Sequence, residues 1–459
     1  MKATISRRAL LAGVAAASSS VPVFFLLRSL PSRTSDVSGD EGLKGEAKWV
    51  PGACAVCGQG CPVRLKVLNG DTIVGVSFNA EPGRSQYYAV CGKVYAIPYA
   101  HRHPNRIKRP MIRDGPRGSG SFRPVSWDEA LDYVAENLRK YASAPHQVLV
   151  FSHQGWEAPL MDEFMRLFGT PNVTDHADTC FHSSAAGRWF LFGRTVGPGA
   201  TYPDYEHAQF VVLMGRNPYG GTVAAPWTKT LSEAVSRGLR LVVFDVRYSE
   251  VCEVAERYYL VRPGTDLAVS LAIAREIIVN KWYNSDYLNR YTTAGMLFYA
   301  DSMKPVKLRR IESGERAGKL DYLVYCDVDK MYRFRSEAKR AKLDFSGIFE
   351  GKRVVTALRT LGTALERYTP EWAESVSGVP AGEIRWVART LAGYGSRGFV
   401  DPGYKSVRYR NEPMLHRVNA LVNVLIGSWG SKGGVAWSRK LPVPTPLPEG
   451  GFKVVAGKC

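Results

Sequence analysis

Four of the chain's eight cysteines lie close together near the N-terminus. Their spacing is C-x2-C-x3-C-x29-C, and the residues are Cys54, Cys57, Cys61 and Cys91. The first three share a short loop with Gly58 and Gly60, so their thiolates can converge on one centre, and a fourth thiolate can complete it from a distance. Four thiolates are what an iron–sulfur cluster requires. The spacing therefore predicts a [4Fe-4S] cluster.

Two other uses of these cysteines stay open. Structural zinc usually takes two pairs of cysteines, and Cys91 stands alone. Disulfides form in exported proteins. The absence of a C-x-x-C-H motif argues against covalent haem.

The basic composition points to a phosphate-bearing partner. The 459 residues include 61 Lys and Arg against 42 Asp and Glu, which gives a net charge of +19. Such a charge suits nucleic acid or a phosphate-rich cofactor. An exported protein rarely meets nucleic acid, so we expect the cofactor. The length allows about two to four domains.

The residues at the N-terminus match the pattern of an export signal. Arg7 and Arg8 precede an apolar run from Ala9 to Leu27, which is the twin-arginine pattern; an ordinary secretory signal is the alternative. The twin-arginine route carries folded proteins and suits one whose cofactor is inserted before export. We expect the protein at the outer face of the cytoplasmic membrane, in the periplasm or its equivalent, with the signal either cleaved or kept as an N-terminal anchor.

Short apolar runs predict a parallel sheet. Continuous apolar runs bounded by polar residues are typical of strands buried on both faces. The helical pattern of Thr228–Arg237 lies between two of them and completes a βαβ unit, so the body is predicted to be α/β. The predicted strands are Gln147–Ser152, Phe210–Met214 and Leu239–Asp245.

Two further helices are predicted on either side of this unit. Ser126 and Glu129 form a capping pattern for an amphipathic helix over Trp127–Tyr141. Asp266–Lys281 is predicted to be a strongly amphipathic helix. The residues from Gly295 to Gly351 show no regular pattern.

Polar and small residues follow three predicted strands: Phe210–Met214, Leu239–Asp245 and the run Tyr258-Tyr259-Leu260-Val261. Ligands of open α/β sheets bind at the carboxyl ends of the strands, where glycine lets the backbone approach a pyrophosphate and carboxylates can bind ribose or guanine. The arginines can neutralise phosphate, while Asp266 can equally be a helix N-cap. No G-x-G-x-x-G follows a strand, which argues against a nicotinamide cofactor. The candidate cofactor-binding residues are Gly215, Asn217, Asp245, Arg247, Arg262, Gly264 and Asp266.

Several separate blocks together resemble the catalytic subunits of the molybdopterin oxidoreductase (dimethyl-sulfoxide reductase) family. The resemblance runs from about Val50 to Trp437 and is strongest to the polysulfide, thiosulfate and arsenate reductase branch. The blocks are the cysteine spacing with Lys93, then Val125-Ser126-Trp127-Asp128-Glu129-Ala130-Leu131, Arg262-Pro263-Gly264-Thr265-Asp266, Tyr368-Thr369-Pro370-Glu371-Trp372 and Ser377-Gly378-Val379-Pro380.

The resemblance implies a fold and its cofactors. A small [4Fe-4S] domain at 48–108 would be followed, at 109–437, by interleaved Rossmann-like parallel-sheet lobes that bind molybdopterin guanine dinucleotide. The metal would be molybdenum or tungsten, held by two such dinucleotides. Residues 1–31 would be the signal or anchor, 32–47 a linker and 438–459 a Pro-rich tail.

The resemblance also assigns roles around Cys180, which lies in a polar loop after the helix-like Leu160–Phe168. The family places its protein ligand to the metal here, and a thiolate suits such a metal; a buried structural thiol is the alternative. His176 and His182 are candidates for proton delivery or oxyanion binding, or for structural roles. Lys93 would lie between cluster and pterin, where its charge assists electron transfer.

Two further observations concern the substrate and the remaining cysteines. Phe181 replaces the histidine that follows the ligand in formate dehydrogenases, which argues against formate. Cys252 and Cys326 stand alone and are predicted to be buried thiols.

The function implied is two-electron sulfur- or oxygen-atom transfer on a small inorganic substrate, with polysulfide, thiosulfate or tetrathionate preferred. The alternatives are an arsenate or nitrate reductase, a non-catalytic iron–sulfur electron-relay protein and a zinc-binding module. An iron–sulfur electron-transfer subunit together with a membrane quinone-linked subunit are the implied partners.

Family members continue beyond the segment that ends at Trp437. A Pro-rich stretch is a plausible connector, so we expect this chain to be the N-terminal part of a split or interrupted enzyme. A second polypeptide would then supply the rest of the cofactor pocket.

Overall fold

The computed structural model of the chain describes residues 45–54, 56, 61–78, 91–152, 158–175, 182–193, 201–220, 225–314, 317–401 and 409–437. The predicted export signal, Cys57, His176, Cys180 and the Pro-rich tail lie outside these residues. The chain divides after Arg106 into two compact units, which we name the N-terminal unit and the α/β unit.

The N-terminal unit is built on a three-stranded antiparallel sheet. Strands β1 (Ala47–Cys54), β2 (Cys61–Leu68) and β3 (Thr72–Phe78) lie in that order. A 3-10 turn, η2 (Gly92–Ala96), and helix α2 (Ile97–Arg102) follow. The small core consists of Cys54, Cys61, Val63 and Val94.

A four-stranded parallel sheet is the centre of the α/β unit. Its order is β11-β10-β9-β18, and every neighbouring pair is parallel. The chain moves outward from β9 to β11 and returns beside β9 as β18, so the strand order reverses between β9 and β18. The strands are β9 (Phe210–Met214), β10 (Arg240–Asp245), β11 (Arg257–Leu260) and β18 (Gly398–Val400).

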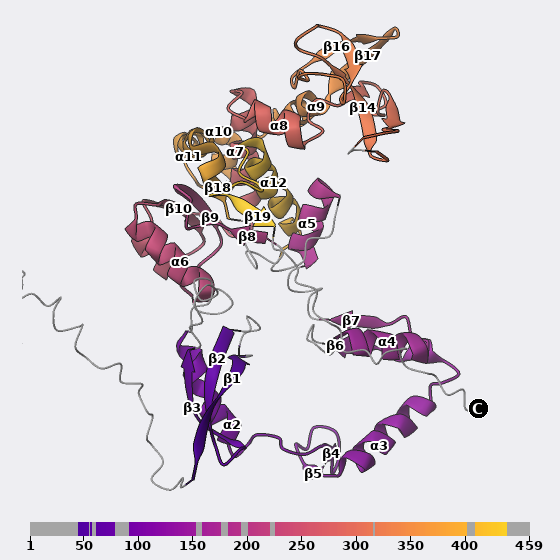
Figure 1. The fold of residues 1–459 in the computed structure, drawn as a ribbon, viewed down its shortest axis with the longest axis vertical. Coiled ribbons are helices and arrows are strands. Elements are labelled where there is room, and N and C mark those ends of the chain that lie inside the picture. Colours follow the sequence, from indigo (N-terminus) through magenta and orange to yellow (C-terminus); the bar gives the residue numbers. More distant parts are fainter. Residues whose placement is uncertain are drawn as a thin grey trace, which may run out of the picture. The chain divides into compact units, whose positions relative to one another are not determined.

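Alternate residues of β9 enter two different cores. Val211 and Leu213 face the cluster that includes Leu231 of helix α6 (Ala225–Ser236). Phe210 and Val212 face the opposite cluster, to which helices α7 (Asp266–Val279), α11 (Ala381–Tyr394) and α12 (Glu412–Leu425) contribute. Helices therefore cover both faces of the sheet, as Figure 1 shows. This confirms the predicted βαβ unit and the strand Phe210–Met214.

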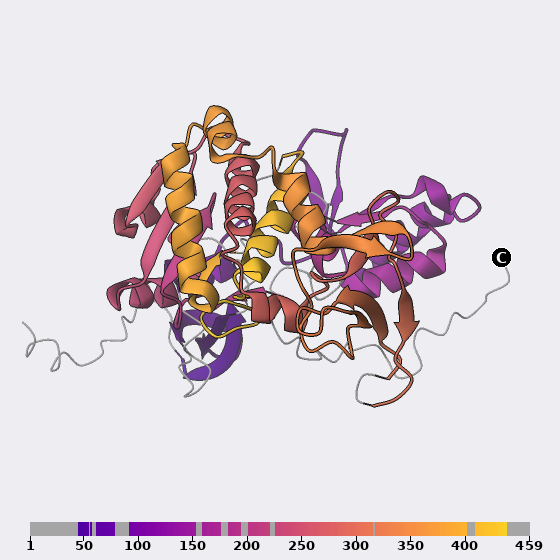
Figure 2. The same ribbon diagram turned by 90° about the horizontal axis from the view of Figure 1, so that it is seen from above.

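Helix α7 (Asp266–Val279) differs from the amphipathic helix predicted over Asp266–Lys281. It packs against α10 (Pro370–Ser377), α11 (Ala381–Tyr394) and α12 (Glu412–Leu425), which Figure 2 shows together. Most of its residues are buried, polar ones included. The predicted helix is confirmed, but its predicted amphipathic character was wrong, because a helix surrounded by other helices has no solvent face.

The region from Gly295 to Gly351, in which the sequence shows no regular pattern, contributes to two small antiparallel sheets. Helix α8 (Ser285–Tyr291) precedes them and α9 (Ala357–Leu365) follows. Except for β14 (Leu320–Tyr325), which has six residues and is largely buried, their strands are three to five residues long and partly or fully exposed, which explains the weak pattern. The first sheet holds β12 (Leu297–Tyr299), β17 (Lys352–Thr356) and β16 (Ser346–Phe349), and the second β13 (Leu308–Arg310), β14 (Leu320–Tyr325) and β15 (Tyr332–Phe334).

The first part of the α/β unit is a hairpin, two helices and a two-stranded sheet. The hairpin joins β4 (Met111–Arg113) and β5 (Phe122–Pro124). Ser126 caps helix α3 (Trp127–Arg139) by accepting a hydrogen bond from the Glu129 amide, as predicted. Strands β6 (Val150–Ser152) and β7 (Val173–Asp175) pair in parallel around α4 (Ala158–Phe168).

The strand predicted over Gln147–Ser152 is only partly correct. A 3-10 turn occupies Pro145–Gln147, and the strand begins at Val150. Leu149 and Phe151 are 66% and 68% exposed, so the strand is not buried on both faces. An apolar run becomes buried only where other elements cover it.

No helix in the described part of the chain has the length and apolar character needed to cross a lipid bilayer.

Candidate functional site

Three of the four clustered cysteines lie in the N-terminal unit as described. Cys54 ends β1, Cys61 begins β2, and the two are directly paired across the sheet. Cys91 lies at the N-cap of η2, three residues before Val94, which packs against both of them. Among the described cysteines, Cys54, Cys91, Cys252 and Cys326 are free thiols. Thiols that are close and free of disulfides are available as metal ligands.

Lys93 lies in η2, two residues after Cys91, and is half-buried. Cys252 and Cys326 are buried, as predicted.

The predicted cofactor-binding residues lie at or just after the carboxyl ends of the parallel strands. Gly215 follows β9, and its amide donates a 2.8 Å hydrogen bond to the Phe244 carbonyl. Asn217 forms a turn, since its Oδ1 accepts from the Tyr219 amide while its Nδ2 donates to Glu250. Asp245 ends β10 and is buried.

Arg247 and Arg262 differ in how they are held. Arg247 is exposed after β10. The Arg262 Nη1 donates to the backbone carbonyls of Ser375 at 2.7 Å and Val376 at 3.2 Å. Arg262 thus binds the last turn of α10. Gly264 has a φ of +78°, a conformation that side chains other than glycine's rarely adopt.

Asp266 is the most buried of these candidates, with 2% of its surface exposed. It is the first residue of α7, and Thr265 occupies the N-cap position, which was the alternative role considered for Asp266. The Asp266 Oδ2 has no hydrogen-bond partner among the described residues. Burial raises the pKa of Asp266, and its neighbour Asp245 raises it further. A buried carboxylate oxygen without a donor is suited to receive one from a ligand.

Helix α5 (His182–Phe192) begins directly after the loop that holds Cys180 and His176. His182 is its exposed first residue. The helix packs against α12, where a Cβ added at Gly187 would come within 2.2 Å of the Pro413 carbonyl oxygen. Only glycine permits this approach.

A buried polar contact joins the same two helices. The Ser183 hydroxyl donates a 2.7 Å hydrogen bond to Glu412, and the other oxygen of Glu412 lies 3.4 Å from the His416 Nε2. Glu412 and His416 are both buried. This contact holds the start of α5 against α12.

Sequence reasoning missed a charged cluster at the point where the strand order reverses. Arg216 follows β9, Asp401 follows β18, and the Arg216 Nε lies 3.2 Å from an Asp401 carboxylate oxygen. Tyr205 donates a hydrogen bond to the same carboxylate. Arg188 of α5 is 3% exposed and donates a 3.0 Å hydrogen bond to the Thr201 hydroxyl. We name these residues, Arg188, Tyr205, Arg216 and Asp401, the switch-point cluster.

The two arginines of this cluster are compensated unequally, because Asp401 helps to raise the pKa of Arg216 whereas the pKa of Arg188 is lowered. Burial lowers the pKa of Arg188 to about 10, and the charge of Arg216 lowers it further, against the opposing effect of Asp401. A shift of that size corresponds to about 3 kcal/mol. An arginine stays charged at neutral pH, so the folded chain carries this cost. The sequence signal was weak: one arginine within an apolar helix.

One further group of ligand-type side chains lies at the surface. Ligand atoms of Asp204, Glu206 and His207 lie within 4.8 Å of one another. Asp204 already accepts hydrogen bonds from His207 and from the Gly433 amide, so its lone pairs are in use within the protein.

Comparison with known proteins identifies this architecture. The profile of the molybdopterin oxidoreductase family matches residues 106–431. The chain belongs to the molybdopterin oxidoreductase family. Its relatives are molybdopterin-dependent oxidoreductases.

Two curated relatives act on sulfur compounds, by their names. The chain is 26% identical to the molybdopterin-containing subunit of thiosulfate reductase from Salmonella typhimurium, over 97% of this chain and 49% of the relative. It is 27% identical to a sulfite dehydrogenase subunit from Allochromatium vinosum, over 77% of this chain and 37% of the relative. The chain therefore spans about half the length, or less, of these relatives.

A solved structure supports the fold. Acetylene hydratase from Pelobacter acetylenicus superposes with a TM-score of 0.62 at 20% sequence identity, over 84% of this chain and 44% of that one. The mixed helix and sheet fold of the family is thus present here.

The described residues fit the molybdopterin cofactor that this family uses. Asp266 offers a buried carboxylate oxygen without a donor. Gly215 and Gly264 bring backbone close to the strand ends, and the switch-point cluster supplies positive charge there. These are the groups that a phosphate-bearing pterin needs at the carboxyl edge of a sheet.

Proposed function

We propose that this chain is the catalytic part of an exported molybdenum or tungsten oxidoreductase. Two molybdopterin guanine dinucleotides would hold the metal, and a [4Fe-4S] cluster on Cys54, Cys57, Cys61 and Cys91 would relay electrons. The observation that carries the proposal is the family match over the sheet whose strand ends hold Asp266 and the switch-point cluster.

The chain's own residues would bind and orient the cofactor. Asp266 would accept hydrogen bonds from a guanine or ribose group, and Gly264 would let the backbone approach it. Asp245, Asn217 and the arginines Arg247 and Arg262 would line the same edge. When bound, the cofactor supplies two-electron redox chemistry at the metal.

Around the metal, Cys180 would be the protein ligand. The contact of Ser183 with Glu412 would fix the end of its loop. His176 and His182 would deliver protons or bind an oxyanion. Lys93, close in sequence to Cys91, would place a positive charge on the path between cluster and pterin.

We propose that the substrate is a small sulfur species: polysulfide, thiosulfate or tetrathionate. The two relatives named above, which act on thiosulfate and sulfite, support this choice. Arsenate and nitrate are the alternatives. The electron partners would be an iron–sulfur subunit together with a membrane quinone-linked subunit, at the outer face of the cytoplasmic membrane after twin-arginine export.

Metal analysis with two cysteine variants tests the proposal. The purified full chain should contain molybdenum or tungsten and about four irons per chain. Cys57→Ser should lose the iron. Cys180→Ala should keep the iron and lose thiosulfate or polysulfide reduction, measured with a reduced dye as electron donor.

Cys326→Ala is the matched control, because Cys326 is a buried thiol outside both proposed metal sites. It should keep metals and activity. Iron without molybdenum or tungsten would identify an electron-relay protein, and zinc alone would identify a zinc-binding module. Full activity of Cys180→Ala would contradict its role as a ligand.

A further inference from the structure

Two ionisable side chains are buried where α12 meets α5, and the proposed cofactor site does not use them. Glu412 and His416 lie one turn apart on α12, and each is 2% exposed. The Glu412 Oε1 lies 3.4 Å from the His416 Nε2, and the Glu412 Oε2 accepts a 2.7 Å hydrogen bond from the Ser183 hydroxyl of α5. Ser183 is only half-buried. An imidazole, a carboxyl group and a hydroxyl thus follow one another from the core to the first turn of α5.

The other two buried polar side chains of α12, a helix described along its whole length, are neutral amides. They lie on the same face as the pair, because positions 412, 416, 419 and 423 are three or four residues apart. The Asn419 Oδ1 accepts a 2.7 Å hydrogen bond from Ser270 of α7, and Asn423 forms two 2.8 Å hydrogen bonds with the backbone of Val400 in β18. Amides therefore suffice to join α12 to α7 and β18. The contact with α5 is different, because it uses groups that can exchange a proton.

The elements packed against α12 carry further titratable or charged groups, as does the segment before it. These groups are His182 and Arg188 on α5, Asp266, Arg275 and Glu276 on α7, Asp401 after β18, Tyr409 and Arg410 ahead of α12, and Arg417 within it. Burial raises the pKa of Tyr409, and the charges of Asp266 and Glu412 raise it further. The Tyr409 hydroxyl and the Asp266 Oδ2 are buried and make no hydrogen bond to the described residues. Two carboxyl groups, a phenol and an imidazole therefore lie in one buried region, which can hold an exchangeable proton.

Reduction of thiosulfate consumes protons as well as electrons. Thiosulfate, two electrons from the donor and two protons give one hydrogen sulfide ion and one hydrogen sulfite ion. The sulfur–sulfur bond breaks, the outer sulfur takes both electrons and leaves as sulfide, and each product carries one of the protons. A proton donor within the protein is needed where water has little access to the reacting atoms.

We infer that His416 and Glu412 form a relay that supplies these protons through the Ser183 hydroxyl. Under the proposed function, on which this inference rests, thiosulfate is reduced at the site that Cys180 completes. Helix α5 follows the Cys180 loop directly in the sequence. His416 passes a proton to Glu412, and Glu412 passes one to the Ser183 oxygen as the Ser183 hydroxyl releases its own at the start of α5.

The test compares the pH profile of kcat in the cofactor-loaded full chain, with thiosulfate as substrate and a reduced dye as electron donor. Glu412→Gln keeps the size of the side chain and an oxygen that accepts from Ser183, but it cannot carry a proton. Its kcat should fall about hundredfold with little change in KM, because a positioned proton donor is lost. The loss should grow as the pH rises, since the variant depends on protons from water. Glu412→Asp should recover part of the activity.

His416→Gln is the second variant and decides the question if Glu412→Gln does not fold. Its kcat should fall about tenfold, and again more at high pH. The smaller loss is expected because Glu412 can still take up a proton from another source.

A second measurement needs neither cofactor nor activity. The chain contains eight histidines, and the ring signals of His416 in nuclear magnetic resonance are identified by their loss in His416→Gln. In the cofactor-free full chain these signals should change as the pH is raised through neutrality. A ring that keeps one protonation state throughout would overturn the inference.

Ser270→Ala is the matched control, because it removes a hydrogen bond to the same face of α12 but no proton-exchanging group. It should lower the thermal unfolding midpoint and leave the pH profile of kcat unchanged. The relay is refuted if Glu412→Gln or His416→Gln keeps the wild-type profile. It is also refuted if kcat falls by one constant factor at every pH, which is what a purely structural role produces.

Metal content tests the proposed function separately. A wild-type chain that contains molybdenum or tungsten and reduces thiosulfate, with variants that keep its pH profile, refutes the relay alone. A wild-type chain without either metal refutes the proposed function, and the relay with it.

Discussion

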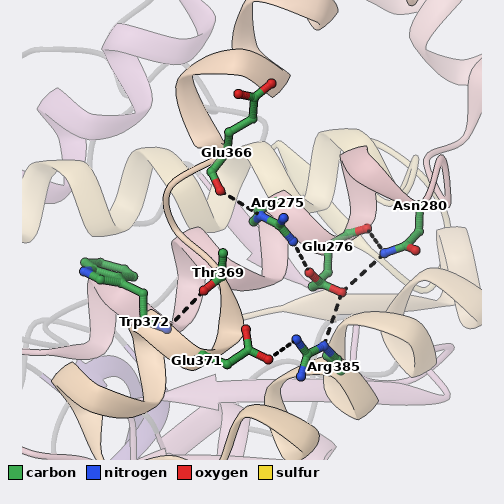
Figure 3. A network of polar contacts seen from close by, with 8 residues as sticks. All are labelled: Arg275, Glu276, Asn280, Glu366, Thr369, Glu371, Trp372 and Arg385. Carbon is green, nitrogen blue, oxygen red and sulfur yellow. Dashed lines mark hydrogen bonds and ion pairs between the residues drawn. The ribbon is translucent and has the colours of Figure 1, made fainter.

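Two clusters in the α/β unit contain buried charged side chains, and they differ in how completely neighbouring groups compensate those charges. In the first, Glu276 of α7 is 5% exposed and surrounded by donors, as Figure 3 shows. Its carboxylate accepts from Arg275 at 2.5 Å and from Asn280 at 3.3 Å, and lies 3.9 Å from Arg385. The second is the switch-point cluster, where Asp401 is shared by two arginines.

The partners of Glu276 also tie α7 to its neighbours. Arg275 donates a 3.1 Å hydrogen bond to the Glu366 carbonyl after α9, and Arg385 of α11 pairs with Glu371 of α10. The arginines of this network reach water, so their charges are compensated within the protein and by solvent. The Glu276 network therefore needs no ligand.

This difference in compensation distinguishes buried charges that stabilise the fold from buried charges that are available to bind a ligand. A buried charge with a full set of partners stabilises the packing of the elements that it joins. Removing it, or one of its partners, strongly lowers the free energy of unfolding. A buried charge in excess lowers stability until a counter-charge binds. Removing the Glu276 carboxylate should therefore destabilise the protein, whereas removing the buried positive charge of Arg188 should not.

The largest effect is expected from Glu276→Ala. It removes the buried carboxylate that joins α7 to α11, and leaves Arg275 and Asn280 without their shared acceptor. We expect the free energy of unfolding in urea to fall by about 3 kcal/mol.

Glu371→Ala is its matched control, since Glu371 pairs with the same Arg385 but is exposed. It should cost less than about 0.5 kcal/mol. Equal costs for the two variants would remove the distinction between a buried network and a surface pair.

A smaller effect of opposite sign is expected from Asp266→Asn. Burial raises the pKa of Asp266, so removing its charge should stabilise the cofactor-free chain at neutral pH if no group of the protein compensates that charge. A loss of stability in this variant would instead show that Asp266, like Glu276, has a structural role.

The pH dependence of this difference follows from the raised pKa of Asp266, whose main cause is burial. Below the ordinary pKa of 3.8, Asp266 is protonated in both folded and unfolded chains and costs nothing. As the pH rises, the unfolded chain ionises first, so the wild type loses stability relative to the variant. The difference should become constant above the folded-state pKa. Urea unfolding of both proteins across this range measures it.

The smallest effect is expected from an exposed pair. Arg333 pairs with Asp329 four residues earlier, and both side chains are more than a third exposed. Arg333→Ala should change the free energy of unfolding by less than about 0.5 kcal/mol, and added salt should reduce the change further. A larger, salt-insensitive loss would show that exposed pairs cannot serve as the neutral reference for the two buried clusters.

Local sequence signals predicted the central sheet well. Phe210–Met214 is a short apolar run flanked by polar residues, and such a run has few other solutions than a covered strand. The same signal misled at Leu149 and Phe151, because burial depends on covering elements and not on the run itself. For α7, the predicted amphipathic character was wrong, since its charged residues Asp266 and Glu276 are both buried.

The sequence by itself determined the βαβ unit, the capped helix that begins after Ser126, and the loops that follow the parallel strands, because propensity, capping and period act between near neighbours. Only the tertiary structure decided that Arg188, Arg216 and Asp401 share one buried space. They come from α5 and from the ends of β9 and β18, more than 200 residues apart at the extremes. A local sequence pattern cannot predict that these three side chains lie together. Their proximity depends on β18 pairing beside β9, which is determined by the packing of whole helices and strands.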